Sequence, residues 1–257
     1  MGQKHRLNQS FIVAVMSVFL LIAVYLTAVV LLPMAGKKEE QESPDDSQHL
    51  SDDAGTGELV TMNIDFSKRL VIVDAGHGGA DPGKVSAEGI LEKDINLAIA
   101  LKLKEKLEDT GINVMLTRTG DDSLNEVDDK NKKRADLERR CDIINNSDAD
   151  LVVCVHQNSY PSPKVSGAQM FFYKKSEESR ALANCMQKVL CEQLGTTRQI
   201  KSDVSYYMLL NSNITTVIAE CGFLSNPEEA ALLNSEEYQE KVAKALFIGI
   251  VEYLESL

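Results

Sequence analysis

Four residues of this 257-residue chain could together form a hydrolytic metal site, although they lie far apart in the sequence. His77 ends the run RLVIVDAGH and His156 ends DADLVVCVH. Glu92 opens the stretch EKDINLAIALKLKEKL, and Glu220 lies in the apolar run TVIAECG. A hydrolytic zinc site typically has three nitrogen or oxygen ligands, an open position for water and a nearby carboxylate that moves protons. Two histidines and two glutamates match that count, with one glutamate to spare.

An α/β fold would position these residues. Beyond the first quarter of the chain, short β-branched runs alternate with longer amphipathic ones, which predicts a single domain with a mostly parallel sheet flanked by helices. Strands are predicted at 70–74, 112–117, 151–155, 167–173 and 216–221, and helices at 92–109, 129–147, 176–194 and 236–256, with a short one after Pro227. Ligands of open α/β sheets bind outside the carboxyl ends of the strands. His77, His156 and Glu220 are expected there, and the loop 76–91 would fold back to bring Glu92 to the same edge.

Each of the four residues also has a purely structural interpretation. Histidines beside glycine or at a strand end, such as His77 and His156, are often only hydrogen-bonded there. Carboxylates at a helix start, such as Glu92 and Asp94, can simply favour the helix dipole, a role that fits Asp94 better. Glu220 is more informative, because an acid in an apolar strand costs desolvation free energy unless it is partnered or used. Burial would raise its pKa toward the range that suits proton transfer.

Other chemistries fit the sequence less well. Cys221 could be a nucleophile, but neighbouring strand residues point to opposite faces, so it cannot share a site with Glu220. The loop GHGGADPG lacks GK[ST], does not fit G-x-G-x-x-G and contains Pro82, which argues against nucleotide binding. The five cysteines form no C-x-x-C pair and are interpreted as small buried side chains. A net charge of −12 without a basic stripe argues against nucleic acid as a partner.

The first 66 residues are predicted to lie outside the globular domain. Residues 11–32 are apolar apart from a serine and a threonine, and a helix of this length spans a bilayer. They are interpreted as an uncleaved transmembrane signal anchor with residues 1–10 in the cytoplasm, and a cleaved signal peptide is the alternative. Residues 33–66 are polar and acidic, which predicts a flexible linker. Residues 67–257 would then form an extracytoplasmic catalytic domain.

Four segments, in order, carry a resemblance to a known family. They are DAGHGGADPG, EKDINLA, VHQNS and ECGFLSNPEEA. From about Lys68 to the C-terminus the chain resembles the zinc-dependent N-acetylmuramoyl-L-alanine amidases, which cleave bacterial peptidoglycan. The HQNS segment and the lack of cell-wall repeats are most similar to the sporulation and germination branch, which acts in the spore cortex. The resemblance implies a six-stranded sheet, one strand more than the pattern predicts.

The resemblance also implies a site and a reaction. One Zn²⁺ would be bound by His77, Glu92 and His156, and Glu220 would take a proton from water and return it to the leaving nitrogen. The bond cut would be the amide between N-acetylmuramic acid and L-alanine of the stem peptide, as the first step of muramic δ-lactam formation. Asn158 could bind a peptide carbonyl of the substrate or only stabilise its loop. An activating lipoprotein is a candidate partner.

Several points depart from the family or stay open. Where the family often has Leu-Arg and later a proline, this chain has Leu210-Asn211 and Thr215-Thr216, so no substrate contact of that arginine is carried over. The stretch between Asn158 and Gly167 is too short for the autoinhibitory helix of divisome-type relatives. Asp74 is a candidate to orient a ligating imidazole, by its nearness in sequence. The alternatives are a non-catalytic module that binds peptidoglycan or a partner, and a zinc peptidase that cuts another bond of the stem peptide.

Overall fold

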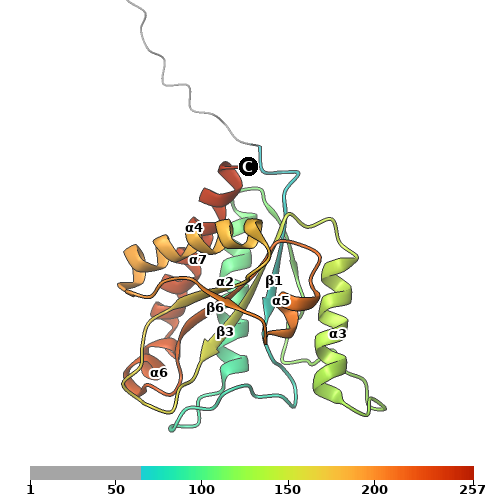
Figure 1. Ribbon diagram of the computed structural model, residues 1–257. Helices are drawn as coiled ribbons and strands as arrows, with labels where there is room; N and C mark the ends of the chain where they lie inside the picture. The colour runs from blue at the N-terminus through green and yellow to red at the C-terminus, as the bar shows by residue number, and fades with distance from the viewer. Residues whose placement is uncertain (1–64) are drawn as a thin grey trace, which may run out of the picture. The chain divides into compact units, whose positions relative to one another are not determined.

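Within residues 65–257, six strands form one mixed sheet that helices cover on both faces (Figure 1). The strands are β1 (Leu70–Ala75), β2 (Asn113–Leu116), β3 (Leu151–Asn158), β4 (Gln169–Tyr173), β5 (Lys201–Asp203) and β6 (Thr216–Phe223). Their order is β2-β1-β3-β6-β4-β5; β2, β1, β3 and β6 are parallel, β4 is antiparallel to β6, and β5 is parallel to β4. The predicted α/β class and the count of six strands are confirmed, with a single antiparallel pairing.

The computed structural model describes residues 65–257. The predicted anchor at 11–32, the residues before it and nearly all of the predicted linker lie outside this range. Among the helices of residues 65–257, none is both long enough and apolar enough to cross a membrane.

Two hydrophobic clusters lie on the two faces of the sheet. The helices are α2 (Glu92–Glu108), α3 (Lys132–Asn145), α4 (Glu177–Leu194), α5 (Tyr207–Asn211), α6 (Pro227–Leu233) and α7 (Glu236–Glu255). Helices α2, α4 and α7 pack over one face, and α3 and α5 over the other (Figure 1). Successive residues of β3 alternate between the faces: Val153 and Val155 join the first cluster, Val152 and Cys154 the second. Because helices cover both faces of the sheet, residues 151–155 of β3 are apolar throughout.

Two short elements were not predicted. Strand β5 has three residues at the edge of the sheet, and α5 has five residues just before the last strand. Neither is long enough to show a hydrophobic period, which is the main signal in a single sequence. Helix α3 is also shorter than the predicted 129–147, because the side chain of Asn131 caps it by accepting from the amide of Arg134.

The parallel centre of the sheet brings the predicted site residues to one edge. Strands β1 and β3 are neighbours, and the amide of Gly76, just beyond β1, donates to the carbonyl of Val155 at 3.1 Å. In the next pairing, between β3 and β6, His156 lies opposite Glu220. Partners opposite each other in a parallel ladder project to the same face, so these two side chains share a face of the sheet.

Candidate active site

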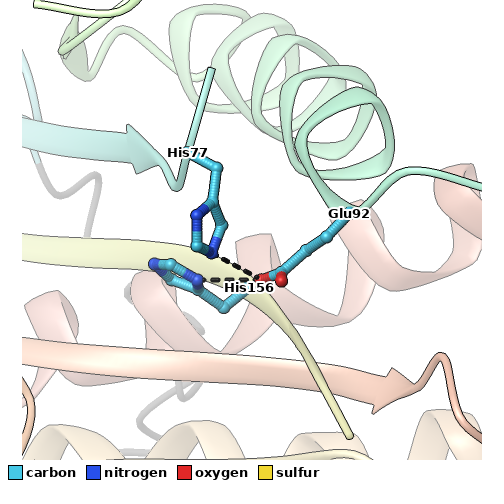
Figure 2. Close-up of side chains that lie close together, drawn as sticks. All are labelled: His77, Glu92 and His156. Carbon is cyan, nitrogen blue, oxygen red and sulfur yellow. Dashed lines mark hydrogen bonds and ion pairs between the residues drawn. The ribbon is translucent and has the colours of Figure 1, made fainter. Parts of the chain in front are cut away.

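The side chains of two predicted residues, His77 and His156, converge on one carboxylate oxygen of a third, Glu92 (Figure 2). His77 follows β1, Glu92 begins α2 and His156 lies in β3. Nε2 of His77 is 3.3 Å and Nδ1 of His156 is 3.0 Å from Oε1 of Glu92. One possible ligand atom from each residue lies within 4.8 Å of the others. The predicted proximity of these three residues is thus observed, and their roles stay predictions.

Glu92 is held as a buried anion. Its side chain is 2% exposed, and its two oxygens accept from the amides of Lys84 at 2.7 Å and Gln157 at 3.0 Å. Burial raises the pKa of Glu92, but the hydrogen bonds and charges of the two histidines outweigh it, so the pKa lies well below its usual range. A carboxylate that stays charged at neutral pH is suited to bind a cation.

The loop 76–91 has glycine at two positions close to the side chains of His156 and Glu92, which leaves room for them. His77 itself has a left-handed backbone, with φ of 63°. A Cβ on Gly76 would overlap the ring of His156, and a Cβ on Gly83 would lie 2.5 Å from Oε2 of Glu92. The loop folds back as predicted, since the amide of Glu92 donates to the carbonyl of Lys84 at 3.0 Å.

Two buried arginines brace the backbone from which His77 projects. Arg140 of α3 donates to the carbonyls of Ala75 at 2.8 Å and His77 at 2.7 Å. Arg118 donates to the carbonyls of Ala75 at 2.8 Å and Gly76 at 3.1 Å. Both guanidinium groups therefore satisfy carbonyls that the end of β1 leaves without strand partners.

The partner of the His77 ring is Asp81, and the interpretation of Asp74 as such a partner was wrong. Nδ1 of His77 lies 2.9 Å from Oδ2 of Asp81. Asp74 instead accepts from Thr117 at 2.6 Å and from Arg140 at 2.7 Å. The buried guanidinium of Arg140, which α3 places beside Asp74, takes up this carboxylate. Carboxylates that hold the second nitrogen of a histidine commonly orient it toward a metal.

Glu220 lies apart from this cluster of ligand-type side chains but faces the same space. It is 5% exposed, and its Oε1 accepts from the hydroxyl of Tyr206 at 2.9 Å. Its Oε2 is buried and has no hydrogen-bond partner within the described part of the chain. Burial raises the pKa of Glu220 above its usual value, which confirms the predicted direction.

Cys221 faces away from the site, as strand alternation predicts. It belongs to the hydrophobic cluster under α2, α4 and α7, whereas Glu220 lines the cavity on the other side. Burial also raises the pKa of the Cys221 thiol well above its usual range, which disfavours the thiolate. The five cysteines, all within the described residues, are unpaired, and Cys141, Cys154 and Cys221 are buried.

A single cavity of about 440 Å³ is lined by all five predicted site residues, namely His77, Glu92, His156, Asn158 and Glu220. The side-chain oxygen of Asn158 accepts from the amide of Ser159 at 2.8 Å, which supports its loop-stabilising interpretation. Sequence reasoning missed Lys84, Lys133 and Tyr206 in the same lining. Asp81 could have been found from its place four residues after His77, but nothing local to Tyr206 distinguishes it.

The donor set fits a metal ion of the kind that hydrolases use. Two imidazoles and one carboxylate are the usual protein ligands of catalytic zinc, and a carboxylate orients one of the imidazoles here. The glycines at positions 76 and 83 leave the three side chains the room to meet, and larger residues would not. The group His77, Glu92 and His156 could therefore hold a metal ion.

Comparisons with known proteins agree with this geometry. The germination-specific N-acetylmuramoyl-L-alanine amidase of Bacillus subtilis (strain 168) is 38% identical over 195 residues, covering 74% of this chain and 82% of that protein. The CwlD amidase of Clostridioides difficile, solved in complex with the GerS lipoprotein, is 42% identical with a TM-score of 0.71, covering 74% of this chain and all of that one.

A further solved relative is the catalytic domain of CwlV, an N-acetylmuramoyl-L-alanine amidase of Bacillus (Paenibacillus) polymyxa var. colistinus. It is 32% identical with a TM-score of 0.65, covering 73% of this chain and 98% of that one. Residues 71–252, from β1 into α7, match the family Amidase_3, N-acetylmuramoyl-L-alanine amidase. The cavity and all of the sheet and helices, except the first residue of β1 and the last three of α7, lie within that match. The chain belongs to the N-acetylmuramoyl-L-alanine amidase family.

Proposed function

We propose that this amidase is zinc-dependent, with His77, Glu92 and His156 as the metal ligands and Glu220 as the residue that transfers protons. The observation that carries the proposal is the contrast between two buried carboxylates in one cavity. Glu92 is bonded by both histidines, whereas Glu220 keeps one oxygen without a partner among the described residues. The first arrangement suits a ligand, and the second suits a base.

The chain's own residues would divide the work of hydrolysis. A bound zinc ion would supply Lewis acidity, which acidifies water and polarises a carbonyl. Glu92 would keep both imidazoles oriented, and Asp81 would hold the ring of His77. Oε2 of Glu220 would accept a proton from water and deliver it to the alanine nitrogen. The amide C–N bond breaks, a C–O bond to the water oxygen forms, and a lactyl carboxylate and a free amine result.

Mass spectrometry of digested peptidoglycan tests the bond that is cut. We expect peptides with a free N-terminal L-alanine, and glycan strands whose muramic acid has a free lactyl carboxylate. Chelation should stop their release, and added zinc should restore it. Shortened stem peptides still attached to muramic acid would support a zinc peptidase instead, and retention of the chain on peptidoglycan without products would support a binding module.

The substrate that we propose is the peptidoglycan of the spore cortex, with muramic δ-lactam as the eventual product. The HQNS segment and the likeness to a germination-specific amidase support this assignment. A strain without the gene should make cortex that lacks muramic δ-lactam. A copy that encodes the chain with Glu220→Gln should fail to restore it, and a wild-type copy should succeed.

A lipoprotein is the partner that we propose, since the solved relative from Clostridioides difficile forms a complex with one. Its effect would be on metal loading. Zinc titration of the purified chain, with and without a candidate lipoprotein of the same organism, should show tighter binding in its presence. Equal affinity in both titrations would remove this activating role.

The cellular position that we propose places the catalytic domain, residues 67–257, outside the cytoplasmic membrane. Residues 11–32 would anchor it, with residues 1–10 in the cytoplasm and residues 33–66 as an acidic linker. The apolar sequence of the segment and a substrate in the cell wall support this arrangement.

A further inference from the structure

The segment between β5 and α5 places a tyrosine hydroxyl on the carboxylate of Glu220. Tyr206 immediately precedes α5, and its hydroxyl donates to Oε1 of Glu220 at 2.9 Å. Oε2 of the same carboxylate has no partner among residues 65–257. The two oxygens are therefore not equivalent, because one is held and the other is available for a proton.

The tyrosine is itself fixed by its surroundings. Its ring meets that of Phe171 in β4 edge to face, with centroids 5.5 Å apart and the planes at 63°. The preceding residue, Ser205, is tied down by its amide and hydroxyl, which both donate to Oδ1 of Asp203, at 2.6 and 2.5 Å. The hydroxyl of Tyr206 thus approaches Glu220 from a backbone and a ring that are already ordered, which lowers the entropic cost of holding the carboxylate.

The hydroxyl of Tyr206 is a donor and not an acid at neutral pH. Burial raises the pKa of Tyr206, and the negative charge of Glu220 raises it further. The proton therefore stays on the tyrosine, and the hydrogen bond stabilises the charged form of the carboxylate. A hydrogen bond to an ionised group is stronger than one between neutral groups.

We propose that Tyr206 is a positioning residue of the amidase reaction, whose hydroxyl holds Oε1 of Glu220 and directs Oε2 toward the reacting groups. This inference rests on the proposed role of Glu220 in proton transfer. Without the hydroxyl, the carboxylate could exchange its two oxygens by rotation. It would also lose the only hydrogen-bond donor that residues 65–257 give it, which favours its charged form.

The variant Tyr206→Phe tests the inference, because it removes one oxygen and keeps the ring against Phe171. With a soluble muropeptide and the full chain, kcat should fall about tenfold or more, the loss that a hydrogen bond to a charged group supports. KM and bound zinc should stay at the wild-type values. The acidic limb of the kcat profile should move to higher pH, since loss of the donor makes Glu220 easier to protonate.

Tyr173→Phe, in β4, is the matched control. Tyr173 packs against the same hydrophobic cluster as Tyr206 but does not line the cavity. Removing its hydroxyl deletes the same atom type outside the cavity. This variant should keep the wild-type kcat and the wild-type pH profile.

The outcomes separate this inference from the proposed function. Wild-type kcat and pH profile in Tyr206→Phe would overturn the inference, and so would a raised KM at unchanged kcat, which would indicate a substrate contact. An equal loss in Tyr173→Phe would overturn it as well. Full turnover in Glu220→Gln would contradict the proposed function itself. An inactive Glu220→Gln together with an unaffected Tyr206→Phe would contradict only the inference about Tyr206.

Discussion

Gly83, like Gly76, lies at the candidate metal centre without room for a side chain. In Gly83→Ala, the new methyl group would lie 2.5 Å from Oε2 of Glu92 and 2.8 Å from Cδ2 of His77. The left-handed backbone, φ 71°, adds about 1–2 kcal/mol of strain for an L-residue. We expect zinc affinity to fall at least about tenfold, as for residues that orient metal ligands, measured by competition with a chelator.

Gly89→Ala provides the control within the same loop. Gly89 has a similar backbone, φ 85°, but a Cβ there would meet nothing within 4 Å among the described residues. This variant should lose a comparable amount of stability and keep its zinc affinity. Equal zinc affinity in both variants would mean that the crowding around Gly83 does not matter to the metal.

At the same scale, the sequence could predict five of the residues that line the cavity, but not Tyr206, which hydrogen-bonds Glu220. His77, His156 and Glu220 end or lie within apolar runs, and Glu92 starts a clear amphipathic helix. Those local signals place them at one edge of the sheet. Tyr206 reaches Glu220 only through a tertiary contact, and no local pattern marks such a contact.

Helix α3 is mostly polar in sequence but contributes one partner of a buried ion pair. Its Arg140 is 1% exposed and pairs at 2.7 Å with Asp74, which is equally buried. Burial raises the pKa of Asp74, but Arg140 and Thr117 outweigh it and bring the pKa below its usual value. In Arg140→Met, the carboxylate would lose its counter-charge, and we expect a loss of about 3–5 kcal/mol of unfolding free energy at pH 7.

The pH dependence of this variant follows from the same pair. In the wild type the pair stabilises the fold above the unfolded pKa of Asp, about 4, and this contribution is lost as the pH falls through the lower folded pKa. In Arg140→Met, burial disfavours the charged form of Asp74 and no guanidinium opposes it. The loss of unfolding free energy relative to the wild type should therefore shrink as falling pH protonates Asp74. Denaturant unfolding with a chelator present, from pH 7 down to about 4, measures this. A deficit that stays constant, or an equal one in the exposed control Arg134→Met, would contradict the account.

Prediction of the elements from the sequence succeeded where burial is complete. The interiors of β1, β3 and β6 are buried and mostly apolar, and α2 was predicted at 92–109 and found at Glu92–Glu108. Strand β5 was not predicted, because its three residues KSD are polar and pair only with β4 at the sheet edge. Tertiary pairing, and not local propensity, makes such a segment a strand.

At the scale of the whole molecule, the proposed anchor makes a prediction about fractionation. The full chain should sediment with membranes and resist extraction by alkaline carbonate, because residues 11–32 would hold it in the bilayer. A chain that starts at residue 65 should stay in the soluble fraction and cleave a soluble muropeptide with the wild-type kcat. Release of the full chain by carbonate, or a mature mass that lacks the apolar segment, would contradict an uncleaved anchor.

The most direct test of the central claim compares bound zinc with turnover in two variants of the site. Glu220→Gln should bind about one zinc per chain, as a three-ligand hydrolytic site does, and should release no peptides from purified peptidoglycan. His156→Ala should lose both the metal and the activity, because it removes a ligand. Full turnover in Glu220→Gln, or normal zinc content in His156→Ala, would contradict the division of roles between the three proposed ligands and the proton-transferring carboxylate.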